Sequence, residues 1–342
     1  MGRCYFLIME WQDHIARIEA FDGLVFDPGL LSDMQYAFSP RTLAGAAPSF
    51  LSYDSDDLPG CGRAAFPTFS ITGPACALDC AHCRAEVLRP MIPATSPEML
   101  EREVRRIADT RHLRGFLLSG GSNRRNEIPY ARYWPAVERL KRDLTDIEIA
   151  VHTGLIDAPR AEAMAGAGVD LAMIDIIGAE KTVREVYNLD RPVADFEASL
   201  AALCAAGLRV APHIVIGLHF GAILGEYQAL EICLRYPISA LVLVVVMPQP
   251  GQDRRFVTPD TDAVGRFLFE ARQAALDLPV TLGCARPHGA ARRRMDAYAV
   301  MAGLDAIAFP SDGAITLARA IGRPIHPDPT CCALGALRRA AA

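Results

Sequence analysis

The sequence has no apolar run long enough to span a bilayer as a helix, which takes about 20 residues. Its longest apolar run, Ala240–Met247, is flanked by Pro237 and Pro248 and suits a buried strand. Residues 1–10 show no secretory or transit signal, because an arginine and an early acid flank only a short apolar stretch. We therefore expect a soluble, cytoplasmic protein with no membrane partner.

An excess of positive charge is also lacking. The chain has 35 Lys and Arg against 40 Asp and Glu, which gives a formal net charge of −5. Nucleic-acid-binding domains usually carry a basic face, so we expect no nucleic-acid partner. Hydrophobic residues make up 51% and charged residues 22% of the chain, which excludes a disordered polymer and indicates a large packed core.

No repeat of fixed period and no low-complexity tract is present, but a regular alternation begins near residue 66. Apolar runs typical of buried strands alternate with segments of helical periodicity. The runs are Phe66–Thr72, Gly115–Ser119, Ile147–His152, Val169–Ile177, Leu208–Gly217, Ala240–Met247, Val280–Cys284 and Ala306–Phe309. Eight such units predict an α/β fold, a (β/α)8 TIM-type barrel whose reactive residues lie at the carboxyl ends of the strands. An open doubly wound sheet is the alternative.

This pattern divides the chain into three parts. We predict an N-terminal extension over residues 1–63, the barrel over residues 64–321 and a cysteine-bearing C-terminal tail over residues 322–342. The tail contains three prolines, and we expect it to fold back across the mouth of the barrel.

Ten cysteines are present, and three of them are clustered. The first predicted strand is followed by Cys76, Cys80 and Cys83, in the spacing Cys-x3-Cys-x2-Cys. Three thiolates can ligate three irons of a [4Fe–4S] cluster and leave the fourth iron open for catalysis. A zinc site or a few buried thiols is the alternative, although His82 is too close to Cys83 in sequence to share one metal with it easily.

The motif resembles the signature of the radical S-adenosylmethionine (SAM) superfamily, in which an aromatic residue such as His82 precedes the last cysteine. The resemblance implies a [4Fe–4S] cluster on Cys76, Cys80 and Cys83 and SAM bound to the open iron. One electron then cleaves SAM into methionine and a 5′-deoxyadenosyl radical.

The same resemblance implies SAM-binding positions at the ends of later strands. These are His82 in the cluster motif, Gly120 and Gly121 after the second strand, Asp175 for a ribose hydroxyl, Arg191 for the carboxylate, and Met247 and Gly251 on the adenine side. The acidic residue that usually follows the glycine pair is absent, because Ser122 stands there. Backbone contacts are therefore expected at the glycines.

Longer phrases resemble the two-component lipoyl synthases of archaea and some bacteria, among them FPTFSITGPACALDCAHC, REVYNLDR, PHIVIGLHFG and LGCARP. This resemblance implies sulfur insertion into an octanoyl chain on a carrier-protein lysine. The partners implied are the octanoylated lipoyl carrier protein or domain, a second radical SAM component, and an electron donor such as ferredoxin or flavodoxin.

Sulfur insertion calls for a sulfide source, and spare cysteines could hold a second, auxiliary iron–sulfur cluster. The candidates are Cys284 at the end of the seventh strand, the adjacent Cys331 and Cys332, and Cys61. The alternative is that these are ordinary free thiols. Of the histidines, His152, His213 and His219 lie at or near strand ends, where they could orient substrate or be satisfied by backbone hydrogen bonds.

Two other functions remain open. A biotin-synthase-like or other radical SAM sulfur insertase would use the same fold. In biotin synthases, however, cysteines occupy interior strand ends where this chain has Ser119, His152 and His213. A non-catalytic iron–sulfur barrel that acts as a sensor or assembly partner is the second alternative.

Overall fold

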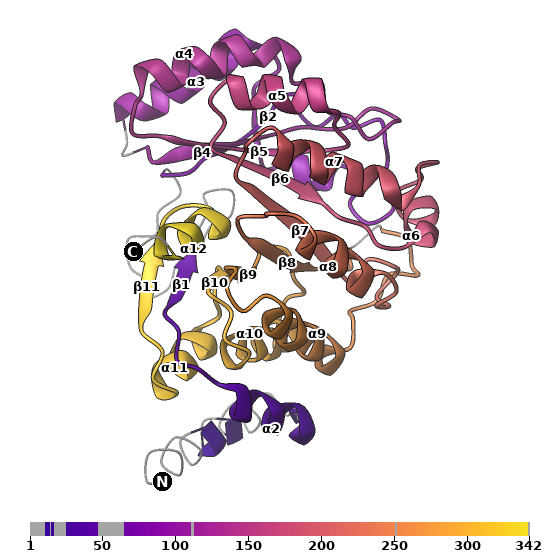
Figure 1. Ribbon diagram of the computed structural model, residues 1–342, viewed down its shortest axis with the longest axis vertical. Helices are drawn as coiled ribbons and strands as arrows, with labels where there is room; N and C mark the ends of the chain where they lie inside the picture. The colour runs from indigo at the N-terminus through magenta and orange to yellow at the C-terminus, as the bar shows by residue number, and fades with distance from the viewer. Residues whose placement is uncertain are drawn as a thin grey trace.

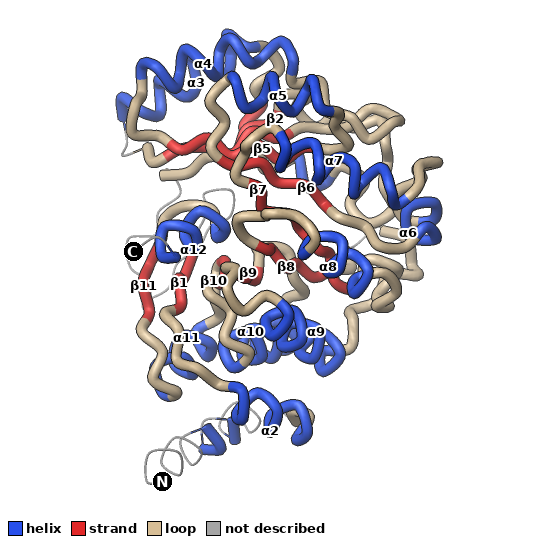
Figure 2. The backbone as a smooth tube through the Cα atoms, viewed as in Figure 1, coloured by secondary structure: helices blue, strands red, loops and turns tan. Residues whose placement is uncertain are grey.

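One continuous sheet organises the molecule (Figures 1 and 2). The structure is a computed structural model that describes residues 11–13, 15–16, 25–46, 65–110, 113–249 and 252–340. Its eleven strands run in the order β11-β1-β10-β9-β8-β7-β6-β5-β4-β2-β3, and every pairing between neighbours is parallel. Consecutive strands from β4 to β10 lie side by side, as repeated βα units require.

All eight predicted strands are present in the predicted order. They are β2 (Thr68–Ser70), β4 (Gly115–Ser119), β5 (Glu148–Thr153), β6 (Leu171–Asp175), β7 (Val210–Ile216), β8 (Leu241–Val245), β9 (Val280–Leu282) and β10 (Ala306–Ala308). Three further short strands were not predicted from the sequence: β1 (Leu43–Ala46), β3 (Ile92–Pro93) and β11 (Ile325–Asp328).

Helices join these strands. Those of the repeating units are α3 (Pro97–Thr110), α4 (Trp134–Asp143), α5 (Ala158–Gly166), α6 (Glu180–Glu185), α7 (Val193–Ala205), α8 (Glu226–Leu234), α9 (Thr261–Ala274), α10 (Ala290–Met301) and α11 (Asp312–Ala320). Outside the units lie α2 (Pro28–Ala37), α12 (Cys332–Ala340) and the 3-10 turns η1 (Glu86–Leu88) and η2 (Ala131–Tyr133).

The predicted fold class is confirmed as a TIM-type parallel α/β architecture, in the form of a curled half-barrel. The sheet is not a closed ring of eight strands. Its edges are β3 and β11, and in the described chain no pairing joins them. One edge is built by β1, from the predicted extension, and β11, from the predicted tail, so both ends of the chain extend the same sheet.

The two faces of the sheet pack against different partners. Along β8, Leu241, Leu243 and Val245 belong to the core under the outer helices, whereas Val242 and Val244 belong to a second core on the concave face. This alternation follows from the two-residue period of a strand.

The second core contains α12. The helix packs against β1, β9 and β10, and Cys332, Ala333, Leu334 and Ala336 are buried there. Many strand residues on this face are alanine, which leaves room for a helix inside the curl: Ala44, Ala46, Ala150, Ala211, Ala306 and Ala308. The predicted tail thus enters the half-barrel, where Figure 1 shows α12 beside β1 and β11.

No described helix has the length and apolar character needed to cross a membrane.

Candidate functional site

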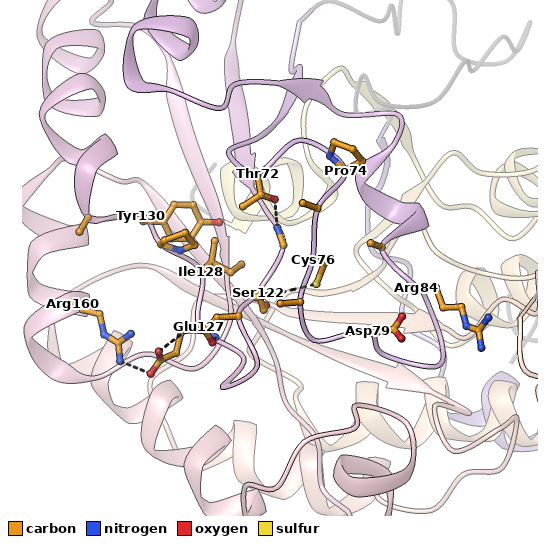
Figure 3. A pocket seen from close by; sticks show the side chains of 17 residues that line it. Thr72, Pro74, Cys76, Asp79, Arg84, Ser122, Glu127, Ile128, Tyr130 and Arg160 are labelled. Atoms are coloured by element: carbon orange, nitrogen blue, oxygen red, sulfur yellow. Dashed lines mark hydrogen bonds and ion pairs between the residues drawn. The ribbon is translucent and has the colours of Figure 1, made fainter.

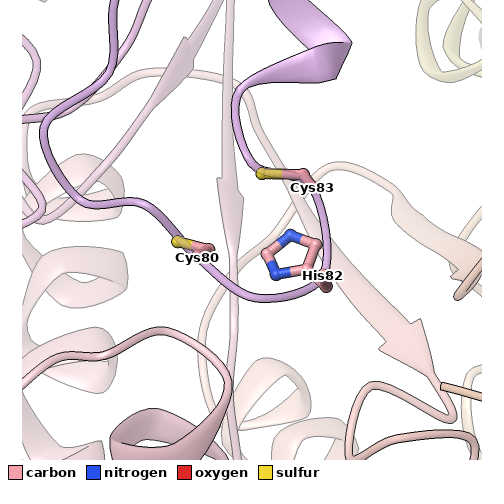
Figure 4. A group of neighbouring side chains, drawn as sticks. All are labelled: Cys80, His82 and Cys83. Atoms are coloured by element: carbon pink, nitrogen blue, oxygen red, sulfur yellow. The ribbon is translucent and has the colours of Figure 1, made fainter. Parts of the chain in front are cut away.

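The predicted cluster motif lies in a loop between β2 and η1, at the carboxyl edge of the sheet. We call residues 73–85 the cluster loop. Three of its residues, Asp79, Arg84 and Ala85, have left-handed backbone conformations with φ between 44° and 61°, which bend the chain sharply. The bend brings the sulfurs of Cys80 and Cys83 and a ring nitrogen of His82 within 4.8 Å of one another (Figure 4).

Cys76 lies on the other flank of the loop, beside a cavity of about 790 Å³ (Figure 3). Its Sγ is 3.7 Å from the carbonyl oxygen of Ser122. The cavity is lined by the cluster loop, by the loop after β4 and by Arg160 of α5. A group bound to Cys76 would therefore be open to a space large enough for a small molecule.

The donor set fits an iron–sulfur cluster. Thiolates are the ligands that such clusters require, and Cys80 and Cys83 already share a hydrogen bond between their sulfurs. That bond, with burial, raises the pKa of Cys80, while the same bond lowers the pKa of Cys83 against the effect of burial. The Nδ1 atom of His82 is buried and has no hydrogen-bond partner among the described residues. Cys76, Cys80 and Cys83 would hold the cluster, and the assignment of individual ligands stays a prediction.

The glycine pair after β4 is placed against the cluster loop. A Cβ on Gly121 would lie 2.0 Å from the carbonyl oxygen of Ala75, and one on Gly120 would lie 2.7 Å from the Ile71 side chain. The Gly121 amide donates to the Thr72 hydroxyl at 2.7 Å. The glycines therefore allow close packing of two loops, and Gly121 also lines the cavity. Contact of either glycine with SAM stays a prediction.

Asp175, at the end of β6, is the centre of a buried polar group. Its carboxylate lies 3.5 Å from Nε2 of His152 and accepts a hydrogen bond of 3.0 Å from the Tyr187 hydroxyl. Burial raises the pKa of Asp175, but His152, His213 and Tyr187 outweigh that effect and hold it well below its usual range. The carboxylate is thus ionised and firmly oriented, as a ribose-binding acceptor must be.

Two of the three histidines singled out lie beside Asp175. The rings of His152 and His213 are 5.2 Å apart. Burial and the charge of His152 lower the pKa of His213 to about 4, whereas Asp175 overcomes the effect of burial and raises the pKa of His152. His219 lies elsewhere, with its ring 3.3 Å from the Thr182 hydroxyl and 4.0 Å from Glu185.

The remaining residues predicted to bind SAM make no hydrogen bond or ion pair with Asp175 in the part of the chain that the structure describes. Met247 lies in the loop after β8, and Gln252 in that loop donates to the carbonyl oxygen of His82, so the loop reaches the cluster motif. Arg191 pairs with Asp195 at 2.5 Å, and its role stays a prediction. Gly251 lies outside the described residues.

Three of the predicted auxiliary cysteines lie in the same concave core, but among the described residues only Cys80, His82 and Cys83 place their ligand atoms compactly enough to hold a metal ion. Cys331 immediately precedes α12, Cys332 is its first residue, and Cys284 follows β9. Cys331 and Cys332 hydrogen-bond through their side chains, and each sulfur also interacts electrostatically with Cys284. We call Cys284, Cys331 and Cys332 the tail cysteine group. Cys61 lies outside the described residues.

The position of Cys331 is chemically distinctive. The Cys332 thiol and the backbone amides of Ala333 and Leu334, at the start of α12, lower its pKa. This is the effect expected of amides at a helix N-terminus. Burial and the neighbouring Cys331 raise the pKa of Cys284 to about 11. Cys331 also interacts electrostatically with His152, so the tail cysteine group faces the polar group around Asp175.

Sequence reasoning missed Tyr187 and Gln252, which both touch the cluster loop. The phrase REVYNLDR contains Tyr187, but nothing in its spacing indicates a partner more than a hundred residues earlier. Tyr187 and Gln252 reach the cluster loop only because the loops after β6 and β8 fold toward the loop after β2, which the sequence does not indicate.

Comparison with known proteins agrees with this geometry. The sequence model of the Radical SAM superfamily matches residues 70–222, which run from β2 to the loop after β7. No protein of curated function matches the sequence.

Solved structures share the fold at low identity. Methylornithine synthase has a TM-score of 0.55 and 12% identity, with 86% of this chain and 82% of that chain covered. HydG, a maturase of the [FeFe]-hydrogenase, has a TM-score of 0.55 and 12% identity, with 88% and 68% covered. SuiB of Streptococcus suis bound to S-adenosylmethionine has a TM-score of 0.50 and 13% identity, with 66% and 50% covered. At this identity the structures support the fold alone.

Proposed function

We propose that this chain is a sulfur-inserting radical enzyme of the radical SAM superfamily, whose sequence model matches residues 70–222 and whose members use a [4Fe–4S] cluster and SAM. Its proposed substrate is an octanoyl chain carried on a protein lysine, and its product is a lipoyl group or a precursor of one. The tail cysteine group is the observation that carries this proposal, since it provides soft sulfur ligands apart from the cluster motif.

The chemistry explains why two cysteine groups are needed. When bound, the first cluster supplies the electron that cleaves SAM to methionine and a 5′-deoxyadenosyl radical. An aliphatic C–H bond offers no acidic proton, so it must be broken by removal of a hydrogen atom, which leaves as 5′-deoxyadenosine. The carbon radical would need a sulfur donor, and Cys284, Cys331 and Cys332 would hold the second cluster that supplies sulfide and accepts the one electron released when the C–S bond forms.

The chain's own residues would prepare both reactants. The ionised Asp175, held by His152 and Tyr187, presents fixed acceptor oxygens at the carboxyl edge of β6. Cys331, whose pKa is lowered at the start of α12, favours the thiolate form that binds metal. The helix α12 packs against the concave face, where Cys332 is buried and Cys284 and Cys331 are partly buried.

The partners follow from the same proposal. The octanoylated lipoyl carrier protein or domain would deliver the substrate at the carboxyl edge. A second radical SAM component would share the two sulfur insertions, and ferredoxin or flavodoxin would supply electrons.

The test is incubation of anaerobically reconstituted protein with SAM, a reductant and an octanoylated carrier, with and without a second radical SAM component. Mass spectrometry of the carrier should show the mass of added sulfur, and 5′-deoxyadenosine should form with it. The matched control carries Cys331→Ala and Cys332→Ala and should add no sulfur. Formation of 5′-deoxyadenosine with an unmodified carrier in every arm would refute the proposal.

A further inference from the structure

A short segment after α6 contacts the cluster loop at consecutive positions. The backbone oxygen of Val186 accepts a hydrogen bond of 2.7 Å from the amide of Ala81. The oxygen of Tyr187 lies 3.8 Å from Sγ of Cys80, and the side-chain amide of Asn188 donates to the oxygen of Asp79 at 2.7 Å. Residues 186–188 thus follow residues 79–81 in antiparallel order. We call residues 186–188 the clamp.

The clamp also contacts the cluster motif through an aromatic ring, that of Tyr187. The Tyr187 ring stacks on His82, with centroids 5.1 Å apart and planes at 29°. Tyr187 is only 4% exposed, and Phe196 of α7 meets its ring edge-on at 6.3 Å. A ring fixed by such packing can hold His82 in place, because a buried aromatic side chain has few alternative rotamers.

Backbone geometry adds to this evidence. Asn188 and Asp79 both have φ of 51°, a left-handed conformation that asparagine and aspartate tolerate better than most residues. The side-chain amide of Asn188 joins these two bends directly. Each bend therefore supports the other.

One further contact links the clamp to the proposed SAM site. The Tyr187 hydroxyl donates to Asp175, so one side chain touches the cluster motif with its ring and the β6 carboxylate with its hydroxyl. We propose that the clamp holds the cluster loop in its cluster-binding shape before iron arrives, and that Tyr187 fixes the distance between that loop and Asp175. Tyr187 and Asn188 are positioning residues in this scheme. The proposal does not depend on sulfur insertion.

The first test is Asn188→Asp, which keeps the size and left-handed tolerance of the side chain but replaces the donor with an acceptor facing the Asp79 oxygen. Loss of one such bond is expected to make iron loss to a chelator about fivefold to tenfold faster. Hydrogen exchange at the Ala81 amide in the iron-free protein should rise in parallel. Arg184→Ala, at an exposed position of α6, is the control and should change neither. An Asn188→Asp protein with wild-type chelator kinetics and wild-type Ala81 exchange would overturn the clamp.

The second test is Tyr187→Phe, which keeps the stacked ring and removes only the hydroxyl. Iron retention should stay within about twofold of wild type, while the dissociation constant for SAM, measured by equilibrium binding, should rise about fivefold. KM for SAM should rise more than kcat falls. Unchanged SAM affinity would overturn the link to Asp175. Both tests omit the acyl substrate, so failure of the proposed sulfur chemistry would leave them valid.

Discussion

The cluster loop and the tail cysteine group are built in opposite ways. Cys76, Cys80 and Cys83 lie close together in sequence, and a bend within one loop brings Cys80 and Cys83 together. The tail cysteine group joins the end of β9 to the start of α12, nearly fifty residues later. The ligands of the first group all come from one loop, which the clamp supports, whereas the second group forms only if α12 packs against the concave face of the sheet.

This difference assigns separate tasks to the two groups. A motif encoded in one loop can serve many reactions, and the fold around it does not name the product. A group assembled by tertiary packing depends on the particular helix and strands that surround it. We therefore expect damage to the cluster loop to abolish all radical chemistry, and damage to the tail cysteine group to change only the product.

The largest effect should come from Cys80→Ala. It removes a buried thiol that we propose as a ligand of the first cluster, so formation of 5′-deoxyadenosine should fall by about a thousandfold or more, as measured by chromatography after dithionite reduction. Cys204→Ala, at a half-buried cysteine of α7, is the control and should keep wild-type turnover. Substantial activity in Cys80→Ala would contradict the role of the motif.

The second largest effect should come from substitutions in the tail cysteine group. In the Cys331→Ala and Cys332→Ala double variant, sulfur transfer to the carrier should fall by about a hundredfold or more, because the second site loses two of its ligands. 5′-Deoxyadenosine should still form, uncoupled from product. Parallel loss of both products, with the first cluster intact by its spectrum, would mean that the two groups do not act separately.

A smaller effect concerns pH and the polar group between the two sites. The pKa of His213 is about 4 in the folded chain against an ordinary 6.5. Between these values the unfolded chain binds the extra proton, so stability falls as pH falls from 6.5 to 4, by up to about 3 kcal/mol. His213→Gln should flatten this dependence in denaturant titrations. An equally steep slope in the variant would show that other groups cause it.

The smallest effect tests the anchoring of α12. Arg338 donates two bonds of 2.9 Å to Asp328 and also pairs with Glu148 of β5, but its side chain is 40% exposed. Solvent screening limits the expected loss in Arg338→Ala to about 1 kcal/mol of unfolding free energy. Arg142→Ala, which breaks a more exposed pair with Asp143, is the control and should cost less. Equal losses would mean that apolar packing alone holds α12.

The same contrast explains what could be predicted from sequence. Strands such as β8 are continuous apolar runs that can be predicted from the sequence. The Cys-x3-Cys-x2-Cys spacing of the cluster motif likewise predicts an iron–sulfur cluster. The strand β1 has the sequence Leu-Ala-Gly-Ala and lacks a continuous run of large apolar residues. Its alanines are small because α12 packs against them, and that contact shows only in the folded structure. The predicted TIM-type fold class is confirmed, and the structure adds that the sheet is a curled half-barrel with α12 packed against its concave face. The clamp could not be predicted from the sequence, because its contacts join loops that are distant along the chain.

Iron content of the Cys76→Ala, Cys80→Ala and Cys83→Ala triple variant tests the central claim most directly. If the tail cysteine group holds a cluster of its own, the reconstituted variant should keep about four irons per chain, with the Mössbauer signature of one [4Fe–4S] cluster. Further removal of Cys331 and Cys332 should abolish it. A triple variant that retains no iron would contradict the existence of a second site.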